Sequence, residues 1–217
     1  MNPFATDFRS IKPVSFAVKS STEDSGKGFI AKVNRRRFAA LKEAGAIVEV
    51  LPGEGESLHA IMTGFYDLMH VLIAMIDRLG SKCLEMRIAT LSMSARNVQE
   101  LVSLIDLGKV ASISILVSHF FSKHDPDIFK SLLTEFGSRN QLVGVARSHA
   151  KMVTMSMEDG GQWTIEGSAN LRTNRNLEQV TVSRDARLHD WAAQWISEMV
   201  TKNEQREGGQ ADAEKTG

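Results

Sequence analysis

Two pairs of polar residues in the last third of the chain have the side chains of a phosphate-binding site. In His149-Ala-Lys151 an imidazole and an ammonium stand two residues apart, and Ser168-Ala-Asn170 gives a hydroxyl and a carboxamide the same spacing. Residues two apart in a strand point to the same face. The turn-forming sequence Glu-Asp-Gly-Gly at residues 158–161 predicts a hairpin that brings both pairs together. A nucleophile or proton carrier beside a cation and two neutral donors is typical of phosphate chemistry.

Plainer explanations exist for the same residues. The sequence Gly-Ser-x-Asn at 167–170 also fits an ordinary turn, and His149 fits an ordinary histidine of a sheet. Five other polar residues could be considered as metal ligands, namely Asp67, His119, His124, Asp125 and His189. Their spacing matches no metal-binding signature. Asp125 is better explained as the cap of a helix that begins with Pro126. We therefore expect neither a metal nor a cofactor.

Three short sequences in order resemble the signature of the phospholipase D superfamily. They are Ser148-His-Ala-Lys-Met-Val-Thr-Met155, Glu166-Gly-Ser-Ala-Asn-Leu171 and Asn176-Leu-Glu178. The resemblance implies a metal-independent phosphodiesterase that forms a phosphohistidine intermediate, with a nuclease as the first expectation. It implies His149 as the nucleophile, Lys151, Ser168 and Asn170 as phosphate ligands, Gly167 as part of the substrate site, and Glu178 as the residue that orients the imidazole.

The motif His-x-Lys occurs once in this chain. In the family one histidine attacks and a second protonates the leaving oxygen, so the resemblance to the small bacterial nucleases implies a homodimer in which the second subunit supplies the second His149. One position departs from the family pattern, because Ser156 stands where the family has an aspartate. A catalytically silent nucleic-acid-binding or scaffold module on the same fold is the alternative.

The predicted elements place these motifs on an α/β fold. Strands and helices alternate from residue 87 to residue 137, and four strand candidates follow at 141–146, 149–157, 162–169 and 179–183 before an amphipathic helix at 188–200 that buries both of its tryptophans. This order predicts a phospholipase D-like mixed sheet flanked by helices on both faces. Upstream, apolar spacing predicts one long helix over 57–79 that carries His59 and His70, and strands at 14–18, 29–33 and 46–51.

We expect a small N-terminal α/β extension over 1–55, a catalytic domain over 56–202 and a disordered tail over 203–217. The formal net charge is zero, which disfavours nucleic-acid coating by charge alone, but Arg35, Arg36 and Arg37 form a candidate phosphate-backbone patch. A solvated helix face explains this run equally well. DNA is the first candidate partner and RNA the second.

The chain has one cysteine, Cys83, which excludes an intramolecular disulfide, and no apolar run long enough to span a bilayer. We therefore expect a cytoplasmic protein with no membrane partner. Two stretches, EGSANLRTNRNLEQ and GESLHAIMTGFYDLMH, are similar to sequences in proteins of phages and mobile elements.

Overall fold

The computed structural model describes residues 39–173 and 175–204. The strands predicted at 14–18 and 29–33, the arginines Arg35, Arg36 and Arg37, and most of the predicted tail lie outside the described residues.

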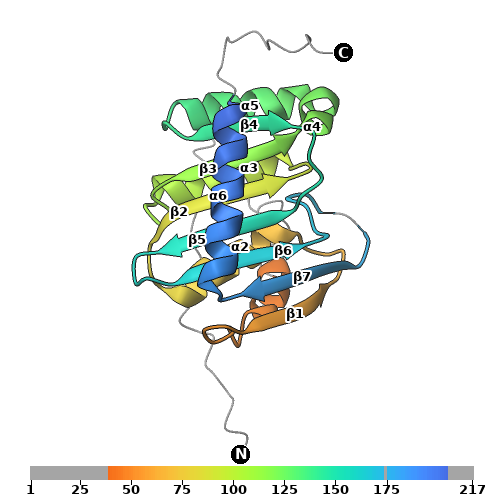
Figure 1. Ribbon diagram of the computed structural model, residues 1–217. Helices are drawn as coiled ribbons and strands as arrows, with labels where there is room; N and C mark the ends of the chain where they lie inside the picture. Colours follow the sequence, from red (N-terminus) through yellow and green to blue (C-terminus); the bar gives the residue numbers. More distant parts are fainter. Residues whose placement is uncertain (1–38, 174, 205–217) are drawn as a thin grey trace, which may run out of the picture. The chain divides into compact units, whose positions relative to one another are not determined.

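Seven strands form one mixed sheet in the order β1-β7-β6-β5-β2-β3-β4 (Figure 1). β2, β3 and β4 are parallel to one another, and β5 joins them to the antiparallel half that contains β6, β7 and β1. The strands are β1 (Ser57–Met62), β2 (Cys83–Thr90), β3 (Ile113–Ser118), β4 (Leu142–Ala146), β5 (Met152–Met157), β6 (Gln162–Gly167) and β7 (Glu178–Ser183). The fold class expected from the sequence is confirmed.

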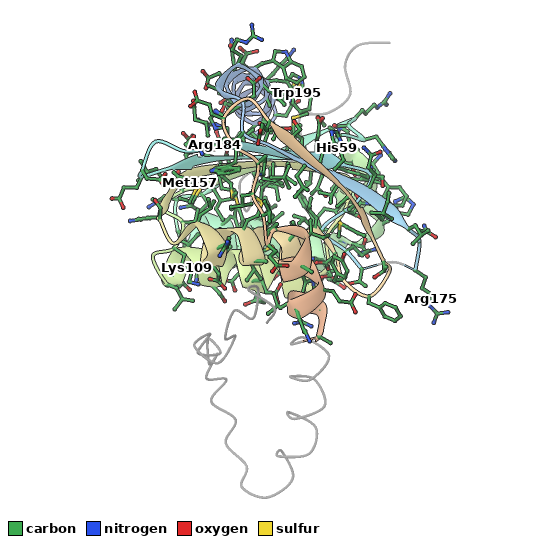
Figure 2. All side chains as sticks on the ribbon, turned by 90° about the horizontal axis from the view of Figure 1, so that it is seen from below. His59, Lys109, Met157, Arg175, Arg184 and Trp195 are labelled. Atoms are coloured by element: carbon green, nitrogen blue, oxygen red, sulfur yellow. The ribbon has the colours of Figure 1, made fainter. Side chains whose placement is uncertain are left out.

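Helices cover both faces of this sheet. The helix α6 (Ala186–Lys202) crosses one face, while α2 (Leu68–Leu79) and α3 (Ala95–Asp106) lie on the other, as Figures 1 and 2 show. The short helix α4 (His119–His124) and α5 (Pro126–Gly137) follow β3 and bury Phe121, Leu132 and Phe136 in the core shared with α2 and α3. In the described part of the chain, no helix is long and apolar enough to cross a membrane.

The alternation of side chains along each strand separates two hydrophobic clusters. Residues such as Val153 and Met155 of β5 face the large core beneath α2 and α3. Ala89, Leu116 and Ala146 face the smaller cluster, where Ile196 and Val200 of α6 pack on them. Gly144 makes this packing possible, because a Cβ atom there would lie 2.8 Å from the Cα atom of Val200.

The predicted helix over 57–79 is wrong in its first half. Residues 57–62 form β1, and α2 begins only at Leu68, capped by the side chain of Asp67. Side chains of β1 alternate between the core face and the opposite face. The spacing of its apolar residues happens to continue the helical pattern of α2. His59 and His70 consequently lie on different elements, His59 on the face of the sheet that carries α6 (Figure 2).

Four smaller predictions also need correction. Residues 46–51 form no strand, because a helix continues to residue 47 and turns follow it. The strand predicted from His149 begins at Met152. Asp125 precedes α5 but makes no side-chain capping bond, since its carboxylate binds Arg172 instead. On α6, Trp191 is 59% exposed rather than buried. The hairpin between β5 and β6 agrees with the prediction.

Candidate active site

The sequence motifs meet at one edge of the sheet. Parallel strands β2, β3 and β4 end at this edge, where β5 and β7 begin and β6 ends. Lys151 immediately precedes β5, and its carbonyl oxygen accepts a hydrogen bond from the backbone N–H of Gly167 at the end of β6 (3.2 Å). The two segments that carry His149 and Ser168 are thus tied together at their backbones. The carboxyl edge of parallel strands is where α/β proteins commonly bind ligands.

His149 and Lys151 contact each other directly. The Lys151 Nζ atom lies 3.0 Å from His149 Nδ1 and donates a further hydrogen bond to the His149 carbonyl oxygen, also at 3.0 Å. An ammonium group can only donate, so Nδ1 acts as the acceptor and the neutral ring carries its proton on Nε2. The imidazole itself is exposed. Both side chains are therefore held together at the surface, where an incoming phosphate can reach them.

The charge state of Lys151 depends on its surroundings. Partial burial lowers the pKa of its ammonium group, and the negative charge of Glu178 opposes that shift without cancelling it. The charge of Glu178 thus acts on this ammonium group. An anion bound beside Lys151, such as a phosphate, would raise this pKa again.

Ser168 is fixed by β7. Its hydroxyl donates to Glu178 Oε2 and accepts from the backbone N–H of Gln179 (3.0 Å), while its own N–H donates to the carbonyl oxygen of Gln179 (3.0 Å). Gly167 allows this approach, since a Cβ atom there would lie 2.0 Å from the carbonyl oxygen of Gln179. The glycine of the motif is therefore required by the close contact of two backbones.

Asn170 begins a loop that runs from β6 to β7. Its carbonyl oxygen accepts from the N–H of Leu68 at 3.4 Å, and its side-chain Oδ1 is buried with no hydrogen-bond partner among the described residues. The next residue, Leu171, forms a bridge with Met93, and its carbonyl oxygen accepts from the side chain of Asn97 (2.7 Å). The position of Asn170 thus depends on the ends of α2 and α3.

A buried carboxylate, Asp67, holds this loop. Its Oδ2 accepts hydrogen bonds from Asn97 Nδ2 (2.9 Å) and Thr173 Oγ1 (3.1 Å), and its Oδ1 lies 2.8 Å from His70 Nδ1. Burial on its own raises the pKa of Asp67, but the hydrogen bonds and charge of His70, with the bonds from Asn97 and Thr173, outweigh it and leave the pKa below its usual value. Asp67 is therefore ionised at neutral pH and links three segments.

A second carboxylate anchors the same loop from the other side. Asp125 Oδ2 accepts a hydrogen bond from Arg172 Nη2 at 2.8 Å, and the same nitrogen also donates to the carbonyl oxygen of Met93 at 3.3 Å. Sequence reasoning named neither Asp67 nor Asp125 as a support of the site. Their partners lie far along the chain, and no local spacing signals such a pairing.

The structure brings His149, Lys151, Ser168 and Glu178 to one edge and places Gly167 and Asn170 in the segment between them. Ser156 lies at the far end of β5, where its hydroxyl is 3.1 Å from Nε2 of the buried His189. Among residues 39–173 and 175–204, no three His, Cys, Asp or Glu side chains gather as a metal-binding group.

Comparison with known proteins identifies the fold. No protein-family model matches the sequence, and no curated protein is similar to it in sequence. The structure is similar to that of Nuc, a phospholipase D family member from Salmonella typhimurium, with a TM-score of 0.51 and 12% identity over 70% of this chain and 98% of that chain. NucT from Helicobacter pylori gives a TM-score of 0.48 and 17% identity over 69% and 98%. The chain thus has a phospholipase D-like fold.

Proposed function

We propose that this protein is a phosphodiesterase of the phospholipase D type that cleaves nucleic acid, DNA in the first place. The observation that carries the proposal is the contact between the Lys151 ammonium and the His149 imidazole, beside Ser168, on this fold. An exposed nucleophile, a cation and a hydroxyl at one sheet edge are the groups that phosphoryl transfer requires.

In the proposed reaction, the phosphate draws the Lys151 ammonium from His149 Nδ1 to its non-bridging oxygens. Nδ1 then takes up a proton from water while Nε2 releases its own to water, and the lone pair of Nε2 attacks phosphorus. The P–O bond to the leaving oxygen breaks as that oxygen receives a proton, leaving a phosphohistidine. Water next attacks phosphorus and gives a proton to the histidine that protonated the leaving oxygen. The P–N bond breaks and its electron pair returns to Nε2, which restores His149. Lys151 carries the positive charge that stabilises both transition states.

A second histidine must donate the proton to the leaving oxygen, and we propose that His149 of a second copy supplies it. Exposed apolar side chains beside the site support a contact between copies. Leu177, immediately before Glu178, is 73% exposed, and Ile61, whose strand partner is Gln179, is 63% exposed. Large apolar side chains exposed side by side are characteristic of interaction surfaces.

One observation favours a second function, a nucleic-acid-binding module without turnover. Ser156 stands where the family has an aspartate, and its hydroxyl pairs with His189 rather than with any residue named for the site. Ser156 lies at the opposite end of β5 from Lys151, however, so its direct effect on a bound phosphate is small.

The deciding experiment measures hydrolysis of bis-p-nitrophenyl phosphate and of plasmid and single-stranded DNA in the presence of EDTA. Wild type is compared with His149→Ala and with the control His59→Ala, an exposed histidine on β1. We expect turnover that survives EDTA, disappears in His149→Ala and persists in His59→Ala. Mixing wild type with an excess of His149→Ala subunits should lower the activity per wild-type subunit if copies share the site, because a mixed dimer has one His149 where the reaction needs two. Activity that EDTA abolishes would show that the chemistry lies elsewhere, and folded wild type without turnover would favour the binding module.

A further inference from the structure

The segment that carries His149 passes over the ends of two other strands. It leaves β4 at Ala146 and enters β5 at Met152, and β3 and β2 lie between those strands in the sheet. Three strand spacings amount to about 14 Å, whereas six residue steps reach roughly 20 Å when fully extended. The link therefore crosses the sheet edge past the ends of β3 and β2 with little chain to spare, and His149 at its midpoint lies near those ends.

The helix α4 begins at that same place. Its cap residue, Ser118, is the last residue of β3; the Ser118 hydroxyl donates to the carbonyl oxygen of Leu91 beyond β2 (2.5 Å) and accepts from the N–H of Phe121 (3.0 Å). Phe121 is fully buried in the core. Both contacts fix the start of α4 against the strand ends that lie beneath His149.

Phe120 and His124 form a pair of stacked rings on the outside of α4. Their centroids are 3.9 Å apart with an interplanar angle of 21°. His124 Nδ1 lies 2.9 Å from the Phe120 carbonyl oxygen, to which it donates, so the imidazole is held in this orientation. Phe120 is nonetheless 49% exposed, and His124 is exposed as well. The helix α4 thus presents an exposed pair of stacked rings.

Cationic side chains accompany this ring pair. Lys123 is exposed on α4 itself, and Arg147 is exposed in the link, two residues before His149. Base stacking on aromatic rings combined with positive charge along the backbone is how proteins bind single strands, and each stacked base contributes about 1–3 kcal/mol. A base inside a duplex is already stacked and cannot use such a surface.

We propose that the Phe120–His124 ring pair stacks an unpaired base of a single-stranded nucleic acid whose neighbouring phosphate lies at His149. This inference rests on the proposed function and specifies its substrate. Phe120 supplies the stacking face, and Arg147 and Lys123 contact the phosphates on either side. The protein therefore prefers single-stranded substrates or unpaired ends to fully paired duplex.

The test compares Phe120→Ala with Phe120→Trp and with Leu107→Ala, a 52%-exposed apolar control that follows α3 at the opposite sheet edge. Kinetics are measured on a single-stranded oligonucleotide, a duplex of the same sequence and bis-p-nitrophenyl phosphate. Phe120→Ala should lower kcat/KM for the single strand, relative to bis-p-nitrophenyl phosphate, by about 5- to 150-fold. Phe120→Trp should retain the preference, and Leu107→Ala should match wild type.

Equal losses on all three substrates, or an unchanged single-strand preference in Phe120→Ala, would overturn the proposal. So would a dimer-to-monomer change in Phe120→Ala by sedimentation, because Phe120 would then be a contact between copies. If wild type turns over no substrate, the proposed function fails. Base stacking on the Phe120–His124 ring pair is then still tested by fluorescence anisotropy of the labelled single strand. A 5-fold or greater loss of affinity in Phe120→Ala supports it there, and a smaller change refutes it.

Discussion

Replacing Asp67 with asparagine tests whether one buried carboxylate supports the candidate site. The substitution keeps the shape and the Oδ1 acceptor, which receives the N–H of Met69 at 3.1 Å. It converts Oδ2 to an NH₂ group facing Asn97 Nδ2, which lies 2.9 Å away and also donates. Thr173 can rotate its hydroxyl to accept instead, but the amide of Asn97 cannot. The substitution thus removes a charge and places two donors against each other.

The expected cost follows from these contacts. A hydrogen bond to a charged group contributes about 1.5–3 kcal/mol, and a buried donor left without its acceptor costs about 1–3 kcal/mol. Asn97 keeps one of its two hydrogen bonds, to the carbonyl oxygen of Leu171, so the lower half of each of these two ranges applies. We expect Asp67→Asn to lower the free energy of unfolding by about 3 kcal/mol. For a domain of this size the loss lowers Tm by roughly 6–12 °C.

Urea unfolding followed by circular dichroism at pH 7 measures this loss, with Asp77→Asn as the matched control. Asp77 lies on the same helix but is partly exposed and paired with Lys109, so its loss should cost less than about 1 kcal/mol. The folded pKa of Asp67 is below its unfolded value. Its contribution is therefore complete above the unfolded pKa, near pH 4, and disappears as pH falls through the folded pKa. Equal effects of the two substitutions at pH 7 would refute the reasoning.

Three further outcomes are expected. Gly167→Ala should destabilise the protein by more than about 3 kcal/mol, because its Cβ would lie 2.0 Å from the Gln179 carbonyl oxygen. Thermal unfolding measures this loss, and an unchanged Tm would contradict the close approach of β6 and β7. The pKa of Lys151 is lowered, so activity that needs its ammonium group is lost as the pH rises. The midpoint of this alkaline loss should lie below about pH 10.4, the ordinary lysine value. Glu178→Gln should move that alkaline limb of the pH–rate profile lower still, since the carboxylate raises this pKa; a shift to higher pH would contradict the assigned coupling.

Much of the second half of the fold could be predicted because its signals are local. The alternation in β3, the hairpin turn between β5 and β6, and the apolar stripe of α6 each occupy a short window of sequence. The motif residues were also found locally, since His149 and Lys151, and Ser168 and Asn170, are each two positions apart.

The rest was not accessible because it depends on distant partners. Among the described residues β1 is an edge strand that pairs with β7, the last strand described there, so residues 57–62 carried no hairpin signal to separate them from α2. The pairs Asp67–Thr173 and Asp125–Arg172 span 106 and 47 positions. The exposure of Phe120 depended on which of two adjacent phenylalanines enters the core, and only the cap of α4 decides that.

The pairing of the first described strand with the last has a consequence for synthesis on the ribosome. Ser57 and Ser183, whose hydroxyls are 2.8 Å apart across β1 and β7, are separated by 126 positions. At about 5–20 residues per second, β1 waits roughly 6–25 seconds after its own emergence before its partner is made. Throughout that interval the backbone donors and acceptors of β1 that pair with β7 lack this partner, and nascent chains on neighbouring ribosomes can pair with them. Close spacing of ribosomes on the message therefore favours aggregation, and slower initiation should improve the yield of folded protein.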